Sequence, residues 1–494
     1  MDNNLKKLNE IGIALSTEKD INSLLELIVD EAMNITNADG ATLYQIIDHN
    51  TRLKFEISKN ITLDWNFVGI SEEKFFPVKL YNPDTGEPNR ENVSAYCALT
   101  GETVNVKDAY NEKGFDFSGL KGFDEKFSYK SVSLLNVPLK DHENNILGVL
   151  QLVNSIDKTK NKIIPFKKSV VSLIESITSQ AAVALNNTIL IKNLEDVFKS
   201  LIQYTVKAID AKTHHTAGHS SRVAKLTRKM AESINEINKG PYKSINYSKD
   251  ELEEIWIAGL MHDVGKIGTP EHILDKKNKI DGSKFEIVEN RFKYIKSIYK
   301  LTLDKKLIDN KIKELDSDFA LVKSINKQEY ISKEQKKDLD IIFKKTYFDG
   351  FTDKKYLTDE EFNCLLIEKG NLTESERKIM QDHIIHTETL LNRLQFPEKL
   401  ENVPIYANAH HESMDGKGYP NGLSADEIPL PARMMAITDV WDAVTAQDRP
   451  YRPPVPYERA CKIIKEEAEN GKLDKELVEL FINKEIGKKK SHAK

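Results

Sequence analysis

The stretch "MHDVGKIGTPEHIL", Met261 to Leu274, sets a histidine beside an aspartate within a predicted helix. A second stretch, "NAHHESMDGKGYPNGL", Asn408 to Leu423, places two adjacent histidines just before a glycine-rich turn. Adjacent side chains on a helix point about 100° apart, so His410 and His411 cannot both rest in one apolar groove without something polar between them. We interpret the two stretches as parts of a metal site.

Further histidines and aspartates recur in "THHTAGHSSRV", "QDHIIHTE" and "AITDVWDAV", all in the second half of the chain. Imidazole and carboxylate ligands without thiolate favour iron, manganese, nickel or zinc over a structural zinc-thiolate site. Two metals bridged by a carboxylate such as Asp263 and by water would use about six or seven such ligands. A hydroxide bridging them would be nucleophilic at neutral pH.

The two motifs in this order, "HDVGK" from His262 and "HHESMDGKGYP" from His410, resemble the HD-GYP phosphodiesterases, a subset of the HD metal-dependent phosphohydrolases. The resemblance continues through "PLPARMMAITDVWDAVTAQDRPYRP" and implies an all-α catalytic domain. It also implies two or three divalent metal ions, iron first and manganese as the alternative. The metal ligands that it implies are His219, His262, Asp263, His383, His410, His411 and Asp439.

The same resemblance implies roles for residues around the metals. Lys266, with Asp263, would act in catalysis at the scissile phosphate or the bridging water. His215, four residues before His219, would hold a third metal or form a hydrogen bond to one of the metal-ligating side chains. The substrate would be held by Tyr419, Pro420, Asp442, Arg449 and Arg452, although "TAQDRP" is one residue longer than the family's usual segment.

The implied reaction is hydrolysis of cyclic di-GMP to linear pGpG, which some members of the family hydrolyse onward to GMP. In it, a hydroxide bridging the metals attacks phosphorus in line with the leaving oxygen, and Lys266 stabilises charge or protonates the leaving group. Three alternatives stay open. One is hydrolysis of another cyclic dinucleotide such as cyclic GMP-AMP, one is a catalytically silent cyclic-dinucleotide sensor, and one is a scaffold that recruits partners through the Gly-Tyr-Pro loop.

Composition limits the class of protein. The chain has 494 residues, 30% of them charged, and a formal net charge of -5, which argues against a protein that coats nucleic acid. Its 3 cysteines are far apart, so no disulfide framework is indicated. We find neither a secretory signal nor an apolar stretch long enough for a membrane span, and we expect a cytoplasmic, bacterial signalling protein.

Residues 1–168 predict an α+β sensor domain. "KDINSLLELIVDEAMNITNA" has apolar residues at helical spacing with Asp20 at the cap, and "SVSLLNVPL" and "NILGVLQLVNS" read as strands joined by the turn "KDHENN". The arrangement resembles a GAF domain and implies an unknown small-molecule ligand. GAF domains that bind cyclic nucleotides often have a lysine after the asparagine that corresponds to Asn154. This chain has Ser155 there, which argues against a cyclic nucleotide as the ligand.

Two helical segments complete the organisation. Residues 169–204 predict a linker helix whose apolar residues recur at heptad spacing from Leu190 through Leu194, Val197 and Leu201 to Tyr204, as in a coiled-coil homodimer. The catalytic domain covers 205–494. Within it His262 and His383 are much further apart than usual in the family, and the intervening 277–370 predicts an inserted helical subdomain.

Overall fold

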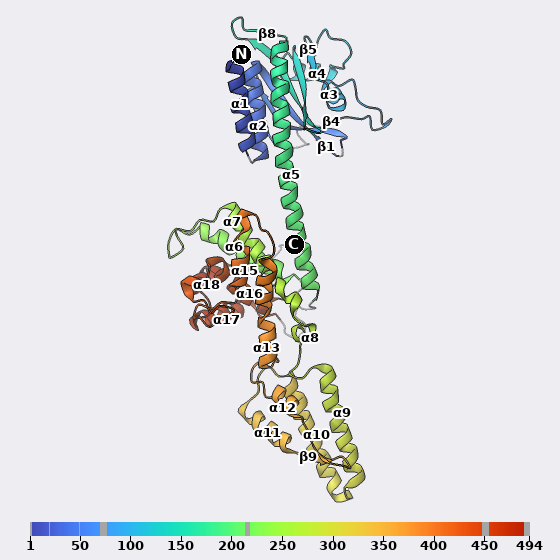
Figure 1. Cartoon of the computed structure of the whole chain (residues 1–494), viewed down its shortest axis with the longest axis vertical. Coiled ribbons are helices and arrows are strands. Elements are labelled where there is room, and N and C mark those ends of the chain that lie inside the picture. The colour runs from blue at the N-terminus through green and yellow to red at the C-terminus, as the bar shows by residue number, and fades with distance from the viewer. Residues whose placement is uncertain are drawn as a thin grey trace. The chain divides into compact units, whose positions relative to one another are not determined.

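The computed structural model describes residues 2–18, 20–48, 50–69, 77–212, 218–446 and 454–488. These residues form two compact units, residues 1–198 and 199–494. The long helix α5 (Lys168–Lys212) contributes residues to both units (Figure 1).

The first unit is built on an antiparallel sheet with the strand order β3-β2-β1-β7-β6-β5, in which β4 also pairs with β2 and β8 with β7. The predicted strands on either side of the "KDHENN" turn are β6 and β7, which pair from Leu134 with Val153 to Lys140 with Ile146. The strands are β1 (Ala38–Ile47), β2 (Arg52–Asn60), β3 (Trp65–Val68), β4 (Val78–Lys79), β5 (Val104–Val106), β6 (Leu134–Lys140), β7 (Ile146–Asp157) and β8 (Lys162–Ile164).

Helices cover both faces of this sheet. The helices α1 (Asp2–Thr17), α2 (Ile21–Thr36) and the first half of α5 share one apolar core with β1, β6 and β7 (Figure 1). Asp20 caps α2 by accepting a hydrogen bond from the Ser23 amide at 2.9 Å, which confirms the predicted helix start. The helices α3 (Val93–Thr100) and α4 (Ser118–Phe127) lie on the other face.

The second unit is mostly helical. One of its cores joins α6, α7, α16, α17 and α18 around buried residues such as Met230, Ile437 and Phe481. The elements are α6 (His219–Asn235), α7 (Lys249–Met261), η1 (Val264–Gly268), α8 (Glu271–Leu274), α13 (Glu374–Gln381), α14 (His383–Leu391), η2 (Glu398–Leu400), α15 (Val403–Asn408), η3 (Ala425–Glu427), α16 (Leu430–Thr445), α17 (Tyr457–Glu469) and α18 (Lys475–Asn483).

The segment between α8 and α13 is folded around a core of its own, with Val288, Phe292 and Leu339 among its buried residues. It contains the predicted helices and also a two-stranded hairpin that the sequence did not predict. Its elements are α9 (Gly282–Thr302), α10 (Lys305–Lys327), α11 (Lys333–Lys344), β9 (Thr346–Phe348), β10 (Asp353–Lys355) and α12 (Asp359–Leu365).

The two ends of this inserted segment are tied together by a buried lysine. Lys279 Nζ donates hydrogen bonds to the carbonyl oxygens of Ile367, at 2.5 Å, and Gly370, at 2.8 Å. After it, Thr373 and Glu376 cap α13 reciprocally. Across the described ranges, no helix combines the length and the apolar character needed to cross a membrane.

Candidate metal centre

The predicted metal ligands come from five helices that meet in the second unit. His219 is the first residue of α6, and His262 and Asp263 follow the end of α7. His383 begins α14, His410 and His411 follow α15 closely, and Asp439 lies in α16. Helix ends and the segments just beyond them thus converge on one place, although His262 and His383 are separated by the whole insertion.

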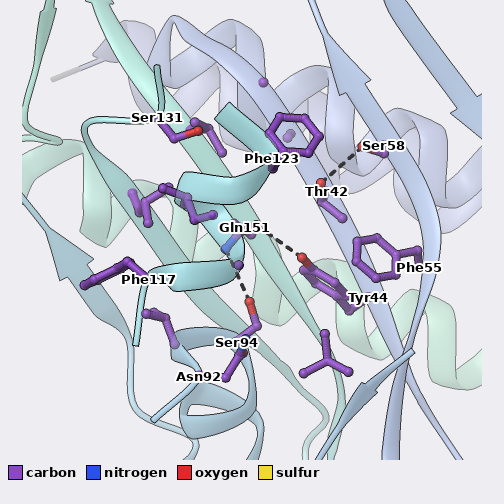
Figure 2. A pocket seen from close by; sticks show the side chains of 18 of the residues that line it. Thr42, Tyr44, Phe55, Ser58, Asn92, Ser94, Phe117, Phe123, Ser131 and Gln151 are labelled. Carbon is purple, nitrogen blue, oxygen red and sulfur yellow. Dashed lines mark hydrogen bonds between the residues drawn. The ribbon is translucent and has the colours of Figure 1, made fainter. Parts of the chain in front are cut away.

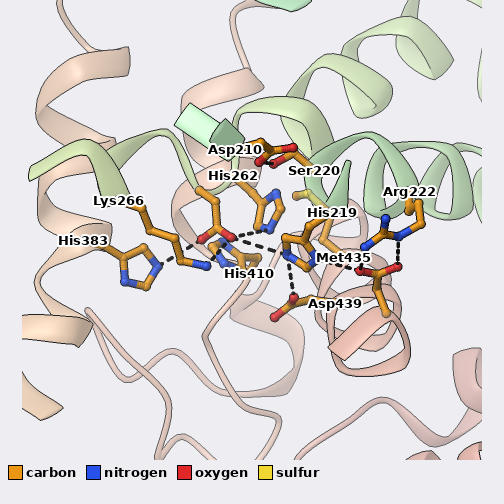
Figure 3. A network of polar contacts seen from close by, with 12 residues as sticks. Asp210, His219, Ser220, Arg222, His262, Lys266, His383, His410, Met435 and Asp439 are labelled. Atoms are coloured by element: carbon orange, nitrogen blue, oxygen red, sulfur yellow. Dashed lines mark hydrogen bonds and ion pairs between the residues drawn. The ribbon is translucent and has the colours of Figure 1, made fainter. Parts of the chain in front are cut away.

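Asp263 contacts several of these histidines, including His219, His262 and His383, which converge in Figure 3. Its Oδ2 is 3.2 Å from His262 Nε2 and 3.5 Å from His219 Nε2. Its Oδ1 is 3.3 Å from His383 Nε2. The two oxygens of one carboxylate therefore face different histidines, which is the geometry of a carboxylate bridging two ions.

The ligand atoms form two overlapping groups. Asp263 groups with His219 and His262 on one side, and with His383, His410 and His411 on the other; within each group the ligand atoms all lie within 4.8 Å of one another. Asp439 adjoins the first group, since its Oδ1 is 3.2 Å from His219 Nε2. All seven predicted ligands are thus brought together.

Several of these atoms are buried without a hydrogen bond. Within the described chain, Nε2 of His262, His383 and His410 and Oδ1 of Asp263 have no hydrogen-bond partner. Leaving such atoms unpaired costs about 1–3 kcal/mol each, so four of them in one cluster need an external partner. A nitrogen and oxygen donor set of this kind suits divalent metal ions of borderline hardness.

The histidine rings are held so that Nε2 faces the cluster. Nδ1 lies 2.8 Å from the Gly259 carbonyl oxygen in His262, and in His383 and His410 it contacts the carbonyl three residues earlier at 2.5 and 2.7 Å. A carbonyl oxygen only accepts, so Nδ1 must carry the proton and the Nε2 lone pair is free for a metal.

His219 is oriented by a side chain instead. Its Nδ1 lies 2.7 Å from Asp442 Oδ2, and Arg222 donates to the same carboxylate through Nε at 2.6 Å and a terminal nitrogen at 3.0 Å. We expected Asp442 to contact substrate, but it is buried and both oxygens are engaged by protein groups. The structure thus places Asp442 against His219 and Arg222, and its contact with substrate stays a prediction. The sequence analysis did not single out Arg222, although its position one helical turn after His219 could have indicated it.

Electrostatics agree with metal ligation. Burial, reinforced by the charge of His411, holds the pKa of His410 well below its ordinary value. Burial likewise lowers the pKa of His411 to about 4. Burial opposes ionisation of Asp263, but the nearby charges of Lys266 and His262 outweigh it and lower that carboxyl's pKa well below its usual value. His410 and His411 are therefore neutral and Asp263 is ionised near pH 7, the protonation states that ligate metals. Burial opposes protonation of His219, but its contacts with Asp263, Asp439 and Asp442 outweigh burial and raise its pKa well above the ordinary value.

Lys266 lies within η1, and its Nζ contacts Asp263 Oδ2. The preceding Gly265 permits this geometry, because a Cβ there would collide with the His383 carbonyl oxygen and with Thr387. The "HDVGK" segment can thus pack directly against α14. This places an ammonium group at the edge of the metal cluster.

The Gly-Tyr-Pro loop is anchored beside the cluster. The Tyr419 ring lies 4.8 Å from the His411 ring, centroid to centroid. Glu412 is buried, and its two oxygens accept hydrogen bonds from the amides of Asn421, at 2.8 Å, and Leu423, at 2.9 Å. Tyr419 and Pro420 remain partly exposed at the rim. Glu412 was not singled out from the sequence, because a buried carboxylate bonded to backbone amides has no motif.

Three predicted residues lie outside the described part of the chain. They are His215, the candidate third-metal ligand, and the candidate substrate contacts Arg449 and Arg452. Their roles stay predictions.

Comparisons with known proteins agree with this architecture. Residues 20–185 match the family model described as GAF domain, and residues 216–344 and 360–477 match two models described as HD domain. The chain therefore combines a GAF domain with two stretches that match HD domains, and both stretches include parts of the inserted subdomain. This confirms the α+β first unit and the mostly helical second unit.

Among curated relatives, "3'3'-cGAMP-specific phosphodiesterase 3" of Vibrio cholerae is 25% identical over 262 residues, which is 53% of this chain and 33% of that protein. "Cyclic di-GMP phosphodiesterase" of Thermotoga maritima is 38% identical over 122 residues, 24% of this chain and 32% of that protein. The chain thus spans about a third of the length of each of these relatives. A solved structure of a GAF domain/HD domain protein from Geobacter sulfurreducens covers 36% of the chain at 13% identity with a TM-score of 0.25.

Proposed function

We propose that the second unit is a metal-dependent phosphodiesterase acting on a cyclic dinucleotide. The observation that carries this proposal is the Asp263 carboxylate, whose two oxygens face separate groups of histidines. Relatives named for cyclic dinucleotide hydrolysis support the substrate class.

The residues present fit two divalent ions. His219, His262 and Asp439 would hold one and His383, His410 and His411 the other, with Asp263 shared. Such ions supply Lewis acidity toward a phosphate oxygen and lower the pKa of bound water. We propose iron, with manganese as the alternative, since both accept imidazole and carboxylate ligands. A third ion held by His215 is a further prediction.

The chain's own groups supply orientation and a proton. The Lys266 ammonium, at the edge of the cluster, would stabilise charge on the reacting phosphate or donate a proton to the leaving 3'-oxygen. Tyr419 and Pro420, with Arg449 and Arg452, would hold the base and phosphate. Asp442 and Arg222 would fix the direction of His219.

Cyclic di-GMP is the proposed substrate, opened to pGpG and then to GMP. Because one of the two relatives described above is named for cyclic di-GMP and the other for cyclic GMP-AMP, the latter is the direct competitor. Incubating the full chain, purified without oxygen, with each dinucleotide and separating the products by chromatography tests the choice. Faster conversion of cyclic GMP-AMP would contradict our substrate, and stoichiometric metal with no turnover of either would favour the sensor.

We further propose that two copies pair through α5 and that the GAF domain regulates hydrolysis through this helix. Leu190, Leu194, Val197, Leu201 and Tyr204 follow heptad spacing and are between 50% and 70% exposed, which is unusual for a stripe of large apolar residues. Light scattering should give a dimer for the full chain and a monomer for Leu194→Lys; a wild-type monomer at micromolar concentration would contradict pairing. The cytoplasmic location stays a prediction.

A further inference from the structure

The first unit contains a cavity that the catalytic proposal does not use. It has a volume of about 630 Å³ and lies over the face of the sheet that α3 and α4 cover (Figure 2). Cavities that bind small molecules usually measure about 300–1,000 Å³. The size therefore suits a ligand, and the chemistry of the lining indicates which kind.

A row of polar side chains crosses the sheet at one level. Thr42 on β1 is the register partner of both Ser58 on β2 and Gln151 on β7, and Gln151 is paired in turn with Asn136 on β6. Directly paired residues point to the same face of a sheet. Four neighbouring strands thus place two hydroxyl side chains and then two amide side chains next to one another. They lie on a face that would otherwise be an apolar core.

These groups are already organised by hydrogen bonds. Gln151 Oε1 accepts from the Tyr44 hydroxyl at 3.2 Å, and Gln151 Nε2 donates to Ser94 Oγ at 3.3 Å (Figure 2). Gln151 Nε2 also donates to Asn136 Oδ1 at 3.1 Å. These side chains can still bond to a ligand, because amide and hydroxyl oxygens accept more than one hydrogen bond. Asn136 Nδ2 is fully buried and has no partner among the described residues, but Asn136 does not line the cavity, so the groups that face a ligand are Thr42, Ser58, Ser94 and Gln151. The network therefore offers fixed donors and acceptors without a formal charge.

Aromatic rings form other parts of the wall. Trp65 and Phe123 meet edge to face with centroids 5.5 Å apart, and Tyr44 and Phe55 meet with centroids 4.7 Å apart. Aromatic faces favour stacking with a flat ring. A planar ligand can thus contact rings with its faces and the polar row with its edge.

The charges at the cavity disfavour an anion. Lys59 is the one lysine or arginine among the described lining residues, and its Nζ is held by Glu26 and Asp30 at 2.8 and 2.7 Å. Two exposed acids, Glu91 and Asp116, also line the cavity. Among the described lining residues, a phosphate would therefore meet carboxylates and a single lysine that two acids already hold.

Asn154, which corresponds to an asparagine of cyclic-nucleotide-binding GAF domains, is already hydrogen-bonded within the chain. Asn154 Oδ1 accepts from the Val132 amide at 2.7 Å, and Asn154 Nδ2 donates to the Lys130 carbonyl oxygen at 2.8 Å. Its amide is therefore used to hold the chain before β6.

We propose that this cavity binds an uncharged planar heterocycle with both hydrogen-bond donors and acceptors, of the size of a nucleobase or nucleoside, and that it rejects the phosphate esters of the same molecule. The ring stacks against the aromatic wall, and its polar edge bonds to the row around Gln151. The proposal concerns binding to the first unit and is independent of catalysis in the second.

Calorimetric titration of the full chain tests the proposal with matched pairs, adenosine against adenosine 5'-monophosphate and guanosine against guanosine 5'-monophosphate. At least one nucleoside should bind, and its monophosphate should bind at least about 10-fold more weakly. No binding by either nucleoside, or equal or tighter binding by the monophosphate, would overturn the proposal. So would an aromatic amine such as tyramine that binds more tightly than both nucleosides.

Variants locate the binding. Gln151→Ala should weaken nucleoside binding at least about 10-fold, while the exposed Gln203→Ala on α5 should leave it unchanged. Ser94→Ala is the milder second variant, expected to weaken binding even if Gln151→Ala fails to fold. Ligand should also change the fluorescence of Trp65, one of 3 tryptophans in the chain. Trp65→Phe should remove that change, and unaltered nucleoside affinity in folded Gln151→Ala and Ser94→Ala would overturn the site.

Discussion

Asp442 Oδ2 lies 2.7 Å from Nδ1 of His219, while Arg222 holds the same carboxylate from the other side. The pair sets the ring direction of a metal ligand without contacting the cluster centre. Partners of this kind typically alter metal affinity by about 10- to 100-fold when they are changed. The positioning role that we propose for Asp442 thus rests on geometry that its sequence position does not reveal.

We expect Asp442→Asn to weaken metal binding about 10- to 100-fold, because the amide no longer provides a carboxylate for His219 and Arg222. Competition with a metal-sensitive dye measures the affinity. Asp426→Asn, whose side chain is exposed, serves as the matched control. Equal metal affinity in Asp442→Asn and wild type would contradict a positioning role.

Lys266→Met should reduce the rate of cyclic dinucleotide hydrolysis about 100- to 10,000-fold, since it removes the proposed proton donor. The metal content should stay the same, because no predicted ligand changes. Lys225→Met, on the exposed side of α6, is the control for loss of a lysine. A Lys266→Met enzyme that turns over at the wild-type rate would exclude Lys266 from the chemistry.

Glu412→Ala should loosen the Gly-Tyr-Pro loop, because the amides of Asn421 and Leu423 lose their buried acceptor. We expect a loss of about 1–3 kcal/mol in the free energy of unfolding and a raised KM, with metal content retained. Thermal unfolding and steady-state kinetics measure the two effects, with the exposed Glu469→Ala as control. An unchanged KM would show that the Gly-Tyr-Pro loop does not contribute to substrate binding.

Cys97 should be unreactive in the folded chain. It is fully buried, and burial raises the pKa of its thiol to about 12, so almost no thiolate forms near neutral pH. Alkylation at pH 8 followed by mass spectrometry should label Cys97 far more slowly in folded than in unfolded protein. Labelling at the unfolded rate would contradict the burial of this thiol.

Much of this architecture could be predicted because local rules govern it. Asp20 and Thr373 are caps at helix starts, and the polar turn between β6 and β7 separates two apolar strands. The metal cluster could be predicted from ligand types, since His262 with Asp263 and His410 with His411 have few structural uses. The insertion was recognised as helical from its periodicity.

What could not be predicted depends on contacts between distant segments. Asp442 and Arg222 meet across 220 positions, and nothing local fixes which carboxylate faces His219. The polar row of the first unit requires the register of β1, β2, β6 and β7, which the sequence of one strand does not determine. The hairpin β9 and β10 is short enough to be lost in a lysine-rich helical pattern.

The bridging position of Asp263 is the central claim, and metal content tests it most directly. The full chain, purified without oxygen, should contain about two iron or manganese ions, or three if His215 binds one. Elemental analysis should find about one bound ion fewer in His383→Ala. In Asp263→Asn both ions that Asp263 contacts should be lost or bound much more weakly. A wild-type chain with one ion or none, or an Asp263→Asn chain that keeps both as tightly, would contradict the account.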